Sequence, residues 1–176
     1  MPNLTNSELT QRAANIQLLI LDIDGVMTDG RLYIGPDGME FKAVSVRDGH
    51  GIKMLQREGI TIAVISGRPS AAMEHRLAEL GVQHVFLAVK DKLAIFEGLL
   101  QELGLNANQA AFMGDDLPDL PVMQACGLAL TVADAAPEIL AAADWVSSKA
   151  GGQGAIREAG EWLIRAHGGQ LTAAQD

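Results

Sequence analysis

The segment "LLILDIDGVMTDG" (18–30) places an apolar run directly before a pair of carboxylates. Asp22 and Asp24 are two residues apart, so in an extended chain their side chains point the same way. Buried charges are costly unless they are paired, and clustered carboxylates therefore require a cation. Oxygen ligands favour a hard ion such as Mg2+, for which Asp115 is the third candidate ligand. The turn between Asp22 and Asp24 would allow one of them to bind through its backbone carbonyl instead.

A second group of residues suits a phosphate. Ser66 supplies a hydroxyl donor, Lys92 supplies a positive charge, and the N–H of Gly67 lies in a loop. With a cation these groups predict phosphoryl transfer, in which catalysis is mainly positioning and charge neutralisation. Asp22 would attack phosphorus and form an aspartyl-phosphate that water then hydrolyses. Asp24 would protonate the leaving alcohol and afterwards deprotonate that water.

Each of these features also has a simpler explanation. An Asp-x-Asp pair can be solvated, and "SGR" (66–68) can cap a helix, because serine is a preferred N-cap. "GDD" (114–116) can place acids at the positive end of a helix dipole. Lys92 alone would be a solvated lysine, and Lys90 is its equal by spacing. The functional interpretation is the stronger one because each feature follows an apolar strand-like run.

The elements that position these residues alternate along the chain. Short apolar runs, typical of strands covered on both faces, are separated by helical patterns. The predicted strands are 18–21, 61–66, 84–89, 110–114, 128–132 and 144–148. The predicted helices are 51–58, 69–80, 92–103, 117–125, 137–143 and 155–167. This alternation predicts a Rossmann-like, three-layer α/β fold whose parallel sheet carries the candidate residues at the carboxyl ends of its strands.

One segment interrupts the alternation. The strand-like runs "RLYI" and "MEFKAV" flank the turn "GPDG", which predicts an inserted β-hairpin over 31–46. A plain surface excursion is the simpler interpretation, but it would leave apolar residues of the hairpin exposed in a monomer. We expect one domain over 1–176 without a large cap domain, ending in a tail over 149–176. The glycine-rich part of this tail, 149–155, is either a mobile loop that reaches a neighbouring subunit or a flexible link.

The composition excludes several classes of function. The 176 residues are 48% hydrophobic, with a net charge of −9 and a pI of about 4.8, which argues against non-specific nucleic-acid binding. No apolar run approaches the roughly 18 residues of a membrane span, and the N-terminus does not resemble a signal peptide. The single cysteine, Cys126, excludes an intrachain disulfide. We therefore expect a soluble cytoplasmic protein.

Four motifs resemble those of the haloacid dehalogenase phosphatase superfamily: "DIDGVMTDG", "ISGR", Lys92 and "GDDLPDL". The resemblance covers essentially the whole chain, and the missing cap domain points to the capless subclass. The resemblance implies that Asp22 is the nucleophile and Asp24 the acid/base. It implies that Ser66 and Lys92 bind the phosphate and that Asp116 supports the site. The implied Mg2+ ligands are Asp22, the backbone carbonyl of Asp24, and Asp115.

Within the superfamily, the hairpin and "GGQGAIRE" (151–158) resemble enzymes that hydrolyse 3-deoxy-D-manno-octulosonate 8-phosphate, an intermediate of lipopolysaccharide synthesis. The resemblance implies a homotetramer with its hairpins packed centrally and neighbouring subunits capping each site. It suggests that Arg47, Arg68 and Arg76 bind the sugar carboxylate, although Arg76 is nearly as well explained as a solvated helix residue.

Two alternatives remain. A nine-carbon sugar acid 9-phosphate is a related substrate, although the nine-carbon enzymes typically carry Glu where this chain has Arg68. A receiver-like signalling domain also accepts a phosphoryl group on Asp, but it lacks both the hairpin and an acid/base at the position of Asp24. The intact set of candidate residues disfavours a non-catalytic tetramer.

Overall fold

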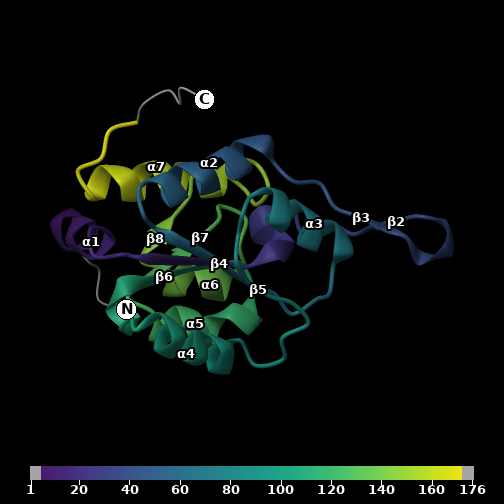
Figure 1. Cartoon of the computed structure of the whole chain (residues 1–176), viewed down its shortest axis with the longest axis horizontal. Helices are drawn as coiled ribbons and strands as arrows, with labels where there is room; N and C mark the ends of the chain where they lie inside the picture. Colours follow the sequence, from purple (N-terminus) through teal and green to yellow (C-terminus); the bar gives the residue numbers. More distant parts are fainter. Residues whose placement is uncertain (1–4, 172–176) are drawn as a thin grey trace.

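A six-stranded parallel sheet forms the centre of the computed structural model, which describes residues 5–171 (Figure 1). The strand order is β5-β4-β1-β6-β7-β8. The strands are β1 (Leu18–Leu21), β4 (Thr61–Ile65), β5 (His84–Phe86), β6 (Ala110–Gly114), β7 (Leu128–Thr131) and β8 (Trp145–Val146). Each predicted strand is present, and the parallel pairing confirms the predicted α/β class.

Helices cover both faces of this sheet. They are α1 (Asn6–Ala13), α2 (Val46–Arg57), α3 (Ala71–Glu79), α4 (Lys92–Leu103), α5 (Leu120–Ala125), α6 (Pro137–Ala142) and α7 (Ala155–Ala166). Helices α2 and α7 lie on one face, and α4, α5 and α6 lie on the other (Figure 1). This is the predicted three-layer arrangement. No helix within residues 5–171 combines the length and the apolar character needed to cross a bilayer.

Strand β1 is the most deeply buried part of the sheet. It pairs with β4 on one side and β6 on the other, so that Ile20 lies between Ala63 and Phe112, and all three side chains are fully buried. The chain leaves β1 towards β4 and β5 and then returns to β6 on the opposite side. Ligands of open α/β sheets bind where the strand order reverses in this way, so the carboxyl end of β1 is the expected binding edge.

Two helices differ from the prediction. Helix α1 was not predicted, although Thr5 and Glu8 form a capping box at its start. Helix α2 begins at Val46 rather than near residue 51, because Ser45 caps its first N–H groups. Glycine is unfavourable inside a helix, but α2 needs Gly51, since a Cβ there would lie 2.8 Å from the Cα of Arg157 in α7.

The predicted hairpin is present and projects from the body (Figure 1). Its antiparallel strands are β2 (Tyr33–Ile34) and β3 (Glu40–Phe41). Asp29 holds its base by accepting hydrogen bonds from the Tyr33 hydroxyl at 2.8 Å and the Arg31 N–H at 3.1 Å. The hairpin patch is the set of exposed apolar residues Leu32, Tyr33, Ile34, Met39, Phe41 and Val44.

The glycine-rich segment 149–155 packs against its own chain, and its contact with a neighbouring subunit stays a prediction. It packs behind the turn Ile23–Met27, which follows β1. The Gly152 N–H donates to the Val26 carbonyl at 3.0 Å, and any side chain on Gly151 would overlap the carbonyl oxygen of Gly25. The segment therefore braces the turn that carries Asp24.

Asp48 ties this loop to α2. Its carboxylate is buried and accepts hydrogen bonds from the N–H of Gly154 at 3.0 Å and the N–H of Arg157 at 2.9 Å. The first N–H groups of a helix have no partner within that helix, so Asp48 caps α7 from a different helix. One side chain thus links α2, the glycine-rich loop and the C-terminal helix.

We expect Asp48→Asn to lower the free energy of unfolding by about 1–3 kcal/mol, because one of the two acceptor oxygens becomes an amide that cannot accept. Urea denaturation measures this change. The control is Asp37→Asn at the exposed hairpin tip, where φ is 62° and asparagine is tolerated. A fall in stability that is no larger for Asp48→Asn than for Asp37→Asn would contradict the capping role.

Candidate active site

The carboxyl ends of β1, β4 and β6, with the start of α4, surround a cavity of about 320 Å3. Its lining residues are Asp22, Asp24, Gly30, Ser66, Gly67, Arg68, Lys92, Asp115, Asp116, Pro118 and Asp119. The structure therefore brings together the carboxylates, the serine and the lysine that the sequence placed at strand ends. A cavity of this size and polarity suits a phosphorylated small molecule.

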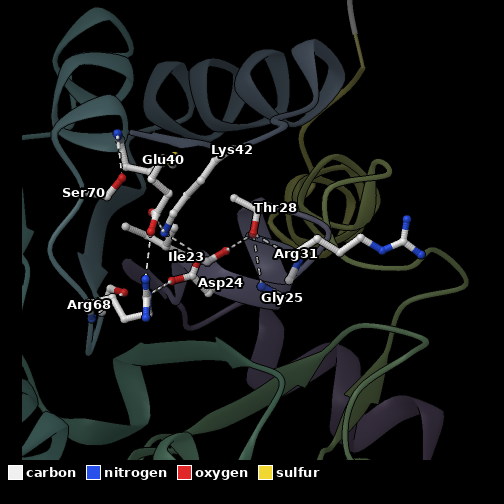
Figure 2. Close-up of polar contacts among 12 residues, drawn as sticks. Ile23, Asp24, Gly25, Thr28, Arg31, Glu40, Lys42, Arg68 and Ser70 are labelled. Carbon is white, nitrogen blue, oxygen red and sulfur yellow. Dashed lines mark hydrogen bonds and ion pairs between the residues drawn. The ribbon is translucent and has the colours of Figure 1, made fainter. Parts of the chain in front are cut away.

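The turn Ile23–Met27 shapes the floor of this cavity. Gly25 has a φ of 95°, and any side chain there would overlap the carboxylate of Asp115. The buried hydroxyl of Thr28 accepts hydrogen bonds from the N–H of Gly25 at 3.3 Å and of Gly30 at 3.2 Å (Figure 2). Thr28 thus fixes the turn from within. Its role was not predicted, although it lies inside the motif "DIDGVMTDG".

Lys92 lies at the centre of the charged groups. Its Nζ is 2.6 Å from Asp119 Oδ1, to which it donates a hydrogen bond, and 2.9 Å from Asp22 Oδ1, with which it forms an ion pair. Burial alone would lower the pKa of Lys92, but Asp22 and Asp119 raise it above its usual value, so the lysine stays charged. Lys90 is exposed on the preceding loop. The structure therefore favours Lys92 as the lysine of the site, a choice that sequence spacing alone left open.

Asp119 is a further acid of the site. It belongs to the motif "GDDLPDL", but no role was predicted for it. It is almost fully buried, and its Oδ2 accepts hydrogen bonds from the N–H groups of Asp115 at 3.0 Å and Asp116 at 3.4 Å. It lies four residues after Asp115 in "GDDLPDL", so one short helical turn returns it to the same edge. This spacing was the available signal for it.

The carboxylates can hold a divalent cation. Asp22, Asp115 and Asp119 each place one oxygen within 4.8 Å of the others. Asp115 Oδ1 is buried and has no hydrogen-bond partner among the described residues, whereas the buried Asp22 Oδ1 has Lys92 as its ion-pair partner. Burial and neighbouring carboxylates raise the pKa of Asp22 to about 6 and that of Asp115 to about 8. A hard cation, which prefers oxygen ligands, would satisfy Asp115 Oδ1 and would share Asp22 with Lys92.

Asp24 does not contribute a side chain to this cluster. Its Oδ1 lies 2.6 Å from Lys42 Nζ, and its Oδ2 lies 3.7 Å from Arg68 Nε (Figure 2). Glu40 joins both cations, because its carboxylate lies 2.8 Å from Arg68 Nη2 and 3.5 Å from Lys42 Nζ. Cation binding through the backbone carbonyl of Asp24 therefore stays a prediction. Lys42 and Glu40 are hairpin residues that the sequence analysis did not connect with the site.

Ser66 and Asp116 could each have been only a helix cap, and the structure shows that Asp116 is one whereas Ser66 does not cap the helix that follows it. Helix α3 is capped by Ser70, whereas the buried Ser66 turns its hydroxyl to the Arg68 N–H at 3.5 Å. Ser66 is therefore not the cap of this helix. Asp116 is exposed and accepts a hydrogen bond from the Leu117 N–H at 2.8 Å, so it does cap a short helix. Its support of the site stays a prediction, and the structure shows two contributions: it caps this short helix, and its charge helps to raise the pKa of Asp115.

The structure separates the three candidate arginines. Arg68 lines the cavity and is half-exposed. Arg76 instead forms an ion pair with Glu79 at 3.1 Å on α3, and its guanidinium lies against Gly49. Arg47 is exposed in the first turn of α2. Only Arg68 of these three is among the residues that line the cavity, since the other two belong to helix surfaces.

Comparison with known proteins gives the family of this chain. The sequence pattern of the haloacid dehalogenase-like hydrolases matches residues 45–127. The chain is 44% identical over 163 residues to 3-deoxy-D-manno-octulosonate 8-phosphate phosphatase from Escherichia coli K12, and the match covers 93% of this chain and 87% of that protein. The chain belongs to the haloacid dehalogenase-like hydrolase family.

Solved structures of haloacid dehalogenase-like hydrolases share the fold. The 3-deoxy-D-manno-octulosonate 8-phosphate phosphatase of Yersinia pestis is 45% identical, with a TM-score of 0.89, and the match covers 91% of this chain and 86% of that one. The enzyme of the same name from Moraxella catarrhalis is 36% identical, with a TM-score of 0.91, over 93% of this chain and 94% of that one. The Moraxella structure is a complex with a magnesium ion, a phosphate ion and KDO.

We expect Mg2+ to stabilise the protein more at about pH 8 than at about pH 6, because protons and the cation compete for Asp115. The folded pKa of Asp115, about 8, lies above its unfolded value of 3.8, so the cation-free protein loses stability as pH rises between these values. Differential scanning calorimetry with and without Mg2+ measures the shift in Tm.

The Mg2+-dependent shift in Tm should become nearly independent of pH in Asp115→Asn. Glu138→Gln, which changes an exposed charge on α6, should retain the behaviour of the unmodified chain. A shift in Tm that is equal at both pH values in the unmodified chain would contradict cation binding at Asp115.

Proposed function

We propose that this chain is a Mg2+-dependent phosphatase that converts 3-deoxy-D-manno-octulosonate 8-phosphate to the free sugar acid and inorganic phosphate. The observation that carries the proposal is the ion pair of Lys92 with Asp22 beside the buried Asp115 Oδ1, which has no hydrogen-bond partner among the described residues. Such a site offers positive charge to a phosphate and open ligands to a cation. The names of the relatives, and the ligands of the Moraxella complex, support the substrate.

In the first step, a carboxylate oxygen of Asp22 attacks phosphorus and forms an aspartyl-phosphate. The bond between phosphorus and the sugar oxygen breaks, its electron pair stays on that oxygen, and Asp24 donates a proton to it. Ser66 and the Gly67 N–H hold the phosphoryl oxygens, and Lys92 balances their charge. When bound, Mg2+ would neutralise further charge on the phosphoryl group.

In the second step, water attacks the aspartyl-phosphate. Asp24, now ionised, accepts a proton from this water, the bond between phosphorus and Asp22 breaks, and phosphate leaves. Asp22 and Asp24 thereby return to their starting states. The separation of their side chains supports this division of labour, because Lys92 pairs with Asp22 whereas Lys42 pairs with Asp24.

Arg68 is our proposed ligand for the carboxylate of the sugar acid. Its guanidinium lies at the edge of the cavity, where Glu40 holds it at 2.8 Å. Arginine binds carboxylates with two parallel hydrogen bonds, so substrate can replace Glu40 as its partner. We do not extend this role to Arg47 and Arg76, because neither lines the cavity of the chain.

We also propose that the chain assembles as a homotetramer through the hairpin patch and works in the cytoplasm. The exposure of Ile34 (69%) and Phe41 (55%) supports assembly, because isolated proteins rarely expose contiguous apolar surface of this kind. The single cysteine suits a reducing compartment.

A phosphate-release screen over sugar phosphates tests the activity. We expect the eight-carbon acid phosphate to give the highest kcat/KM, above the nine-carbon acid phosphate, because Arg68 replaces the Glu typical of the nine-carbon enzymes. Asp22→Asn should lower kcat by at least about a thousandfold while the fold persists by circular dichroism. Preference for the nine-carbon acid would overturn the substrate, and near-normal turnover by Asp22→Asn would overturn the mechanism. Release of one phosphate per chain would instead favour a receiver-like domain.

Light scattering tests the assembly. The unmodified chain should have the mass of four chains, and Ile34→Glu with Phe41→Glu should lower that mass, because charges in the hairpin patch would have to be buried. Val146→Glu is the matched control, since Val146 is also an exposed apolar residue but lies on β8. A monomeric unmodified chain at working concentration would refute the tetramer.

A further inference from the structure

Lys42 reaches the cavity from outside the sheet. It follows β3 in the hairpin, yet its side chain is only 1% exposed. Its Nζ donates a hydrogen bond to Asp24 Oδ1 at 2.6 Å and lies 3.5 Å from Glu40 Oε1 (Figure 2). An exposed ion pair would contribute little, but a lysine buried against a carboxylate of the site restricts the orientation of that carboxylate.

The two oxygens of Asp24 are in different surroundings. Oδ1 is held by Lys42, whereas Oδ2 is buried, has no hydrogen-bond partner among the described residues and lies 3.7 Å from Arg68 Nε. Asp24 also lines the cavity. The hydrogen bond to Oδ1 therefore fixes the rotation of the carboxyl group and leaves Oδ2 as the oxygen without a hydrogen-bond partner among the described residues.

This asymmetry suits a group that must transfer a proton at a fixed place. An acid/base works when its oxygen lies within hydrogen-bond reach of the reacting atom, and small displacements are costly. Without Lys42, the carboxyl group of Asp24 could rotate and exchange its oxygens. It would remain in the site but would spend less time in the productive orientation.

We propose that Lys42 is a positioning residue that orients Asp24 towards the leaving group, so that the hairpin supplies part of the catalytic geometry. This inference rests on the proposed phosphatase function and assigns a role to a residue outside the four sequence motifs. In the step concerned, the proton on Asp24 Oδ2 passes to the ester oxygen as that oxygen takes the electron pair of the breaking P–O bond. Lys42 itself contacts neither phosphorus nor the ester oxygen.

The leaving group separates this role from a structural one. A sugar or alkyl phosphate must release an alcohol, which needs the proton of Asp24. A p-nitrophenyl phosphate releases a stable anion that needs no proton. The quantity to compare is kcat/KM, because it covers the steps up to departure of the first leaving group and excludes the later hydrolysis of the aspartyl-phosphate.

The experiment compares Lys42→Met with Arg31→Met in the full-length chain with Mg2+. Both variants remove one positive charge from the hairpin, but Arg31 points its guanidinium away from Asp24 (Figure 2). For Lys42→Met we expect kcat/KM to fall by roughly 10- to 100-fold with the sugar phosphate and to change by less than about threefold with p-nitrophenyl phosphate. Arg31→Met should leave both values near those of the unmodified chain.

Equal losses of kcat/KM on the two substrates would overturn the inference, and so would an unchanged kcat/KM on the sugar phosphate. A rise in KM for the sugar phosphate at constant kcat would also overturn it, since Lys42 would then be a substrate ligand. If Lys42→Met does not fold or assemble, Lys42→Gln retains a shorter donor and is expected to show the same substrate contrast. Failure of the proposed function is distinct, because the unmodified chain would then release no phosphate from 3-deoxy-D-manno-octulosonate 8-phosphate.

Discussion

The charge of Lys92, buried among carboxylates at the carboxyl edge of the sheet, is the interaction on which the site depends. Asp22, Asp115 and Asp119 must lie close together to act on one phosphate, yet their like charges repel. One lysine offsets only part of this repulsion, and burial together with the neighbouring carboxylates raises the pKa of Asp115 to about 8. The remaining imbalance is what gives the site its affinity for a second positive charge.

The sheet alone does not complete this arrangement. Asp24 turns away from the carboxylate cluster because Lys42 and Arg68 lie on its other side. Lys42 comes from the hairpin, where neighbouring residues of an extended strand point to opposite sides. Phe41 is accordingly exposed, whereas Lys42 is buried against Asp24. The end of β3 and the residue after it thus present an apolar side chain outwards and a charge inwards, which connects any assembly through the hairpin with the orientation of Asp24.

The sequence predicted the sheet well because the fully covered strands are continuous apolar runs, and β1 is buried along its whole length. It also placed Asp22, Asp115 and Lys92 at one edge, because residues that follow parallel strands converge there. The prediction missed the first turn of α2, whose glycines are explained by close neighbours in the tertiary structure: Gly49 lies against Arg76, and Gly51 lies against Arg157 of α7.

The missed site residues share a physical reason. Thr28, Lys42 and Asp119 act through contacts that the tertiary fold creates, and Lys42 lies 18 positions from Asp24 in a segment predicted to serve assembly. Of the three candidate arginines, Arg68 lines the cavity, whereas Arg47 and Arg76 do not. Their residue type suits a carboxylate, but whether a long side chain enters a cavity depends on the helix face that carries it, and Arg76 lies against Gly49 instead.

The close contact between Gly151 and Gly25 has a consequence for building chimaeras within the family. The turn Ile23–Met27 and the glycine-rich loop touch backbone to backbone, with no side chain between them to absorb a mismatch. Small changes in the path of either segment are therefore transmitted directly to Asp24. Recombination that takes residues 18–30 from one parent and 149–157 from another would separate two halves of one rigid unit, whereas crossovers within the exposed surface of α3 or α4 would leave it intact.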